Sequence, residues 1–127
     1  MKITKHIGIS MDHARAQLIE LASGVIETTF INAEFNFPGN DDSPQKSEKT
    51  INNKVRRMEL AYYKEIGKAI LNYDDVLIFG PTEAKTELFN LLRADHHFDK
   101  INIEIKQTDK LTQNQEKSLV IEYFANR

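Results

Sequence analysis

Lysine and arginine side chains gather between residues 46 and 68 at spacings suited to binding phosphate. At about 100° per residue, Arg57, Lys64 and Lys68 fall on one side of a helix. Lys54 falls close to that side. Such a row can contact a phosphate backbone, because each neutralised phosphate releases condensed counterions and the contact needs no base sequence. With structured RNA as the expected ligand, the candidate phosphate contacts are Lys46, Lys49, Lys54, Arg56, Arg57 and Lys64.

A solvated helix face explains the same residues without any ligand. Glu59 and Glu65 are close enough in sequence to screen the cations, and exposed helices commonly carry both signs of charge. The formal net charge is -2, so a protein that coats nucleic acid non-specifically is excluded and any polyanion site must be a local patch.

A second motif lies between Gly80 and Thr86, where a predicted strand runs into a predicted helix. The Lys-Thr pair at its end is typical of a phosphate-binding loop, but the interval is one residue short and the glycine before the lysine is missing. We therefore expect a helix that starts at Pro81 and a solvated Lys85. The expected chemistry is at most a weak anion site formed by Gly80, Thr82 and Lys85.

Four carboxylates are the candidates for a hydrolytic metal pair: Asp12, Asp75, Glu83 and Asp95. A two-metal site requires them to converge within roughly 4 Å of the ions. We expect Asp12 to serve a hairpin turn. Asp75 begins a strand at the end opposite Glu83, and the neighbouring histidines 96 and 97 cannot share a helix face. No metal and no cofactor are therefore expected.

The composition indicates one ordinary globular domain over residues 1–127. Hydrophobic residues make up 40% of the chain and charged residues 28%, which excludes a disordered chain. The absence of cysteine excludes disulfides, thiolate zinc sites and a cysteine nucleophile. No stretch approaches the roughly 18 apolar residues of a membrane span, so we expect no membrane partner and a cytoplasmic location.

Hydrophobic periodicity predicts an α/β fold. Alternating or continuous apolar runs predict five strands, and spacings of three and four predict three helices. The predicted strands are 5–10, 15–21, 25–35, 75–79 and 100–106. The predicted helices are about 51–71, 81–93 and 112–124. The first three strands should form an antiparallel meander, and the rest should follow as βαβ crossovers into a mixed sheet. A long mobile loop is expected at about 36–49.

The same patterns predict which side chains are buried. Strand 75–79 should lie mid-sheet because it is continuously apolar, and strand 100–106 should be an edge because one of its faces is polar. The predicted apolar positions of the helices are Ile51, Val55, Met58, Tyr62, Ile66 and Ala69 in the first, Leu88, Leu91 and Leu92 in the second, and Leu119, Val120, Tyr123 and Phe124 in the third.

Two segments of the chain carry a resemblance to a known family. The first is Arg57-Met58-Glu59 followed by Tyr63-Lys64, and the second runs from Val76 to Leu88. Together with the element order, they resemble the middle domain of archaeal and eukaryotic class-1 peptide release factors and of the ribosome-rescue protein Pelota, an RNase H-like α/β fold. The chain is also similar to small bacterial proteins of this superfamily, which open with a MDHARA-like hairpin and carry a GP-x-E-A-K segment.

The resemblance implies a scaffold without the release chemistry. Release factors carry a Gly-Gly-Gln tripeptide before the long helix, where it supports ester hydrolysis. Lys46-Ser47-Glu48 takes that place here, and the tripeptide is absent from the chain. Lysine and glutamate supply neither the backbone freedom of paired glycines nor the carboxamide, so peptide release is not expected.

We therefore expect a non-catalytic RNA- or ribosome-associated module related to translation factors. One alternative is a protein-interaction module or a homo-oligomer that pairs through the edge strand from Ile101 to Ile105. A second alternative is a carboxylate-dependent hydrolase or nuclease that uses Asp12.

Overall fold

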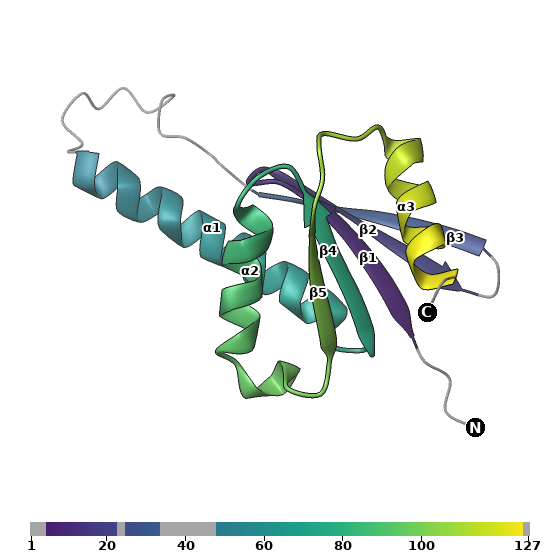
Figure 1. The fold of residues 1–127 in the computed structure, drawn as a ribbon. Helices are drawn as coiled ribbons and strands as arrows, with labels where there is room; N and C mark the ends of the chain where they lie inside the picture. The colour runs from purple at the N-terminus through teal and green to yellow at the C-terminus, as the bar shows by residue number, and fades with distance from the viewer. Residues whose placement is uncertain (1–4, 23–24, 34–47, 126–127) are drawn as a thin grey trace.

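The computed structural model describes residues 5–22, 25–33 and 48–125, apart from the side chains of residues 22 and 48–54. Within these ranges it contains five strands, three α-helices and one short 3-10 helix (Figure 1). In chain order they are β1 His6–Met11, β2 Arg15–Ala22, β3 Val25–Asn32, α1 Glu48–Ile70, β4 Asp75–Gly80, α2 Ala84–Arg93, η2 His96–Phe98, β5 Asn102–Gln107 and α3 Gln113–Ala125.

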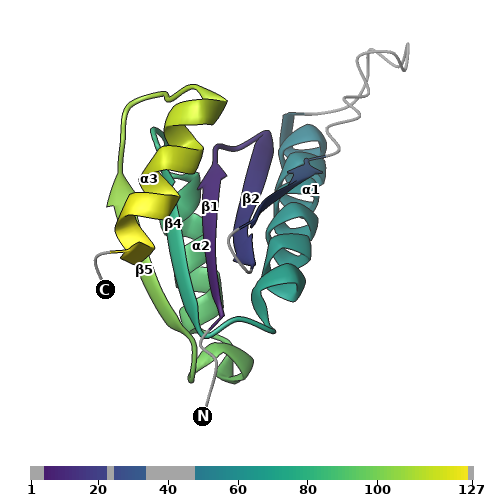
Figure 2. The ribbon, with the colours of Figure 1, turned by 90° about the vertical axis from the view of Figure 1, so that its right-hand side faces the viewer.

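The strands form one mixed sheet in the order β3-β2-β1-β4-β5. The β1–β2 and β2–β3 pairs are antiparallel, whereas β1–β4 and β4–β5 are parallel. Helices α1 and α2 cover one face, and α3 covers the other (Figure 2). The predicted meander followed by crossovers is confirmed, as are the central position of β4 and the edge position of β5.

Two buried clusters hold the three layers together. The larger one lies between the sheet and the α1–α2 layer, and Tyr62, Ile66 and Ile70 of α1 contribute to it. The smaller one lies between the sheet and α3, where Val120 and Phe124 are buried. Six predicted core positions are less buried than expected: Leu91 is 39% exposed, and Val55, Met58, Ala69, Leu119 and Tyr123 are partly buried. The side chain of Ile51 lies outside the described residues.

The elements begin and end close to their predicted bounds. Strand β3 ends at Asn32 and not at residue 35, and α1 already begins at Glu48, inside the predicted loop. The rest of that loop, residues 36–47, lies outside the described residues. Helix α2 begins at Ala84 and not at Pro81, because residues 81–83 form a turn in which the Thr82 hydroxyl accepts a hydrogen bond from the Ala84 N–H. No helix within the described ranges is long and apolar enough to cross a membrane.

The hairpin between β1 and β2 has the predicted carboxylate at its turn. Asp12 Oδ1 accepts hydrogen bonds from the N–H groups of Ala14 at 2.7 Å and Arg15 at 2.8 Å. An aspartate that bonds its own following backbone stabilises a tight turn. The turn role predicted for Asp12 is confirmed.

Gly8 allows α3 to pack directly on the centre of the sheet. A Cβ at this position would lie 2.3 Å from Cγ2 of Val120, closer than two carbon atoms can approach. We expect Gly8→Ala to lower the free energy of unfolding by about 1–3 kcal/mol through overpacking. Urea unfolding of the Gly8→Ala, Val120→Ala and double variants measures the contact. Because the shorter side chain of Val120→Ala makes room for the added methyl group, the double variant should lose less free energy of unfolding than the two single variants lose together. A loss in the double variant equal to that sum would contradict the contact.

Candidate functional site

The basic face of α1, defined here as Arg57, Lys64 and Lys68, lies on the side of the helix that faces solvent. All three residues are exposed, whereas Tyr62, Ile66 and Ile70 of the same helix are buried. From the first cation to the last, the face extends about 16 Å at 1.5 Å per residue. The described residues include no carboxylate that forms an ion pair with this face. The three exposed cations can be reached by an external anion.

The other candidate phosphate contacts are placed differently. Lys46 lies outside the described residues, as do the side chains of Lys49 and Lys54. Arg56 is exposed, but its charge acts on Glu87 of α2 and helps to lower the pKa of that carboxyl. The structure thus brings Arg57 and Lys64 into one row with Lys68, and it separates Arg56 from them. Phosphate binding by these residues stays a prediction.

Tyr63, Glu87 and His13 form a polar cluster beside this helix. The Tyr63 hydroxyl donates a hydrogen bond to Glu87 Oε1 at 2.6 Å, and His13 Nε2 lies 3.3 Å from Glu87 Oε2. The tyrosine bond is the main cause that lowers the pKa of Glu87, and burial raises the pKa of the tyrosine. Glu87 is therefore ionised and Tyr63 neutral at pH 7. The cluster ties the β1–β2 turn, α1 and α2 together.

This cluster makes part of the stability depend on pH. We expect Tyr63→Phe to lower the free energy of unfolding by about 1 kcal/mol at pH 7, because a bond to a charged acceptor is lost and solvent screens the half-exposed carboxylate. The folded pKa of Glu87 lies below the unfolded value of about 4.3, so its contribution is present above that pH. The contribution is lost as the pH falls through the folded pKa. The free energies of unfolding of wild type and variant should therefore become equal below about pH 4, as measured by urea unfolding over a pH series.

Tyr62→Phe is the matched control. Its hydroxyl donates to the backbone carbonyl of Asp12 at 3.0 Å, an acceptor that does not titrate. The loss caused by Tyr62→Phe should therefore stay constant over the same pH range. A Tyr63→Phe loss that is equally constant would contradict the role given to Glu87.

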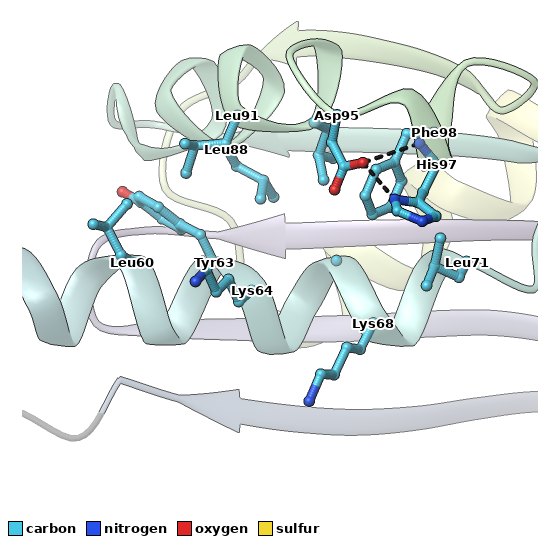
Figure 3. A pocket seen from close by; sticks show the side chains of 12 residues that line it. Leu60, Tyr63, Lys64, Lys68, Leu71, Leu88, Leu91, Asp95, His97 and Phe98 are labelled. Carbon is cyan, nitrogen blue, oxygen red and sulfur yellow. Dashed lines mark hydrogen bonds and ion pairs between the residues drawn. The ribbon is translucent and has the colours of Figure 1, made fainter.

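An apolar groove, called here the α1–α2 groove, runs beside the basic face (Figure 3). It encloses about 380 Å³ between α1 on one side and α2 with η2 on the other. Leu71 and Leu91 on its walls are 44% and 39% exposed. Lys64 and Lys68 come to it from α1, and Asp95 and His97 come from the opposite side. Asp95 Oδ1 lies 2.7 Å from His97 Nδ1, and hydrogen bonds from His97 hold the pKa of Asp95 below its usual range.

The predicted anion site is built differently from expectation. Lys85 is 3% exposed, and its ammonium donates a hydrogen bond to the Thr82 carbonyl oxygen at 2.5 Å. The expectation of a solvated Lys85 is therefore wrong, because the turn at residues 81–83 presents a carbonyl where the helix was expected to start. Gly80 ends β4 at the same place, with φ +156°. Anion binding by Gly80, Thr82 and Lys85 stays a prediction.

Three of the four candidate metal-binding carboxylates serve separate local structures, and the fourth, Glu83, is exposed at the start of α2. Asp12 holds the hairpin turn, and Asp95 bonds to His97. Asp75 accepts a hydrogen bond from Asn102 Nδ2 at 3.0 Å and lies 3.3 Å from His6 Nδ1. Across the part of the chain that the structure describes, no group of three or more histidine, aspartate or glutamate side chains is placed to hold a metal ion.

The topology, with a mixed sheet between an α1–α2 layer and α3, is similar to that of several solved structures. Pelota from Archaeoglobus fulgidus is similar with a TM-score of 0.59 and 11% identity, over 99% of this chain and 32% of that chain. Pelota from Thermoplasma acidophilum gives a TM-score of 0.58 and 15% identity, over 98% of this chain and 33% of that chain. An archaeal translation termination factor gives a TM-score of 0.51 and 11% identity, over 96% of this chain and 39% of that chain.

These similarities establish the fold, so the predicted release-factor and Pelota-like architecture is confirmed. This chain spans about a third of the length of those proteins. No protein-family model matches the chain, and no curated protein does.

Proposed function

We propose that the chain is a non-catalytic RNA- or ribosome-associated module that binds through the basic face of α1. The observation that carries the proposal is the row of exposed cations Arg57, Lys64 and Lys68, none of which is ion-paired to a described carboxylate. Two further considerations support it. A rigid helix keeps the charges in register, and the fold is shared with proteins of translation.

The proposal includes the finer points of the resemblance. We take the chain to be a small single-domain relative, similar to bacterial members of the superfamily, that works in the cytoplasm where ribosomes are found. Because the chain carries no Gly-Gly-Gln tripeptide, the module binds without supporting peptide release.

Binding to purified ribosomes and to a structured RNA, measured at increasing salt, tests the proposal. Three phosphate contacts give a slope of about -2.7 in log affinity against log salt. Raising the salt from about 50 to 200 mM should therefore weaken binding about 40-fold. An affinity that does not change with salt, or no binding at the lowest salt, would contradict the proposal.

The α1–α2 groove favours a second candidate, a protein-interaction role. Its exposed leucines are suited to an apolar side chain of a partner. If Leu91→Glu abolishes ribosome association while reversal of the basic face leaves it intact, then the groove and not the cations mediates binding. Pairing of two copies through the β5 edge also stays a prediction, and light scattering measures it.

A further inference from the structure

A second pocket lies on the α3 side of the sheet, at the carboxyl ends of the parallel strands. It encloses about 300 Å³ and is lined in part by residues of the connection from β5 into α3. Figure 1 shows that connection at the top of the view. In open α/β sheets, ligands bind beyond the carboxyl ends of the strands. This pocket has that position, and it contains none of the residues of the basic face of α1.

The pocket is lined in part by a buried glutamine. Gln17 of β2 is 3% exposed, and neither its Oε1 nor its Nε2 has a hydrogen-bond partner among the described residues. The hydroxyl oxygen of Thr108, also at the pocket, is buried and unpartnered within the same part of the chain. Buried polar groups in native proteins are almost always satisfied. An amide and a hydroxyl left open at one pocket are therefore available to bond a ligand.

The walls restrict the shape of that ligand. Pro81 and Leu111 line part of the pocket with apolar surface, and most of its other lining residues are polar or charged. A flat aromatic ring can pack against the apolar part while its polar edge faces Gln17 and Thr108, and the polar lining suits the hydroxyls of an attached ribose. A glutamine amide presents one donor and one acceptor side by side, which pair with the edge of a nucleobase, most commonly N6 and N7 of adenine.

We propose that this pocket binds a nucleobase, carried by a free nucleoside or by an RNA strand, with Gln17 as the group that recognises its edge. The volume suits a single nucleoside, since it lies at the small end of ligand pockets. The mouth carries the cations Arg15 and Lys110 but also three carboxylates, those of Asp12, Asp109 and Glu116. The acidic excess disfavours a triphosphate. The proposal does not depend on the basic face of α1.

Titration of the full chain with adenosine, with ATP and with a single-stranded tetra-adenylate, followed by NMR or calorimetry, tests the proposal. We expect saturable binding of adenosine and weaker binding of ATP, because the mouth repels the phosphates. Tetra-adenylate that binds more tightly than adenosine identifies a strand as the source of the base, and the reverse identifies a free nucleoside. If neither adenosine nor tetra-adenylate binds at about 10 mM, the proposal is overturned.

Gln17→Met separates recognition from folding. Methionine keeps the length of the side chain but cannot pair with a base, so adenosine should bind at least about tenfold more weakly. The melting temperature should stay level or rise, because the free protein no longer buries an unpaired amide. Gln113→Met, an exposed position on α3, is the matched control and should change neither measurement. Undiminished binding by Gln17→Met would overturn the proposal, and so would a melting temperature lowered by more than about 3 °C.

Thr108→Val provides a second variant that is expected to remain folded. It removes the other unpartnered group at the pocket and changes the side-chain shape little. We expect weaker adenosine binding for this variant as well, and unchanged binding by both pocket variants would assign the ligand to another surface.

Discussion

Reversing Arg57, Lys64 and Lys68 to Glu is expected to weaken binding to ribosomes and structured RNA by roughly 100-fold or more. Each cation near a polyanion contributes about 1 kcal/mol, and the new carboxylates add repulsion where attraction is lost. The salt slope should also become flatter by about 2.7, because three fewer counterion-releasing contacts form. Sedimentation with ribosomes over a salt series measures both effects.

Lys100, Lys106 and Lys117 provide the matched control for this charge change. They lie in the turn before β5, in β5 and in α3, away from α1, and their reversal changes the net charge by the same amount. If binding depends on a local face, the control variant should retain most of its affinity. Equal losses in the two variants would show that only the overall charge matters, and circular dichroism confirms that both are folded.

Gly80→Ala is expected to lower the free energy of unfolding by about 3–5 kcal/mol. The residue has φ +156°, and a Cβ there would lie 2.2 Å from the backbone carbonyl oxygen of Met11. That oxygen belongs to β1, at the centre of the sheet, so relief of the clash requires movement of backbone and not of a side chain. Urea unfolding measures the loss.

Gly67→Ala is the matched control for Gly80→Ala. Its added Cβ would lie 3.3 Å from the ring of Phe98, a side chain that can shift by a few tenths of an ångström. Alanine also favours the helix interior over glycine by about 1 kcal/mol. The two effects oppose one another, so the net change should stay within about 1 kcal/mol. A Gly80→Ala loss no larger than that of the control would contradict the close approach of β4 to β1.

The fold followed from local patterns because burial imposes them directly on the sequence. Continuous apolar residues marked β4 as central, and alternation of Ile101, Ile103 and Ile105 marked β5 as an edge. The start of α2 differs from the predicted one because Pro81 suits both a first helical turn and an isolated turn. The choice between them rests on the Thr82 contacts, which no periodicity reports.

The sites were only partly predictable for a related reason. Helical spacing was sufficient to place Arg57 and Lys64 on one exposed side. The bond from Tyr63 to Glu87 joins residues 24 positions apart, and the contact of Glu87 with His13 joins residues 74 apart, so neither leaves a local signal. Gln17 shows a different limit. Alternation along β2 assigns its side chain to one face of the sheet. That face is covered by α3 and the connection before it, which lie nearly a hundred residues later in the sequence, so the local pattern does not report the burial.

The two buried clusters differ in size, and this difference affects which helix detaches first from the sheet. Helix α3 is held by fewer buried side chains than α1 and α2, so its amide hydrogens should exchange with deuterium before those of the central strands. Detachment of α3 also removes the cover from the surface around Gln17. Any small molecule retained there would slow that exchange, and deuterium uptake would then reveal occupancy without a label on the ligand.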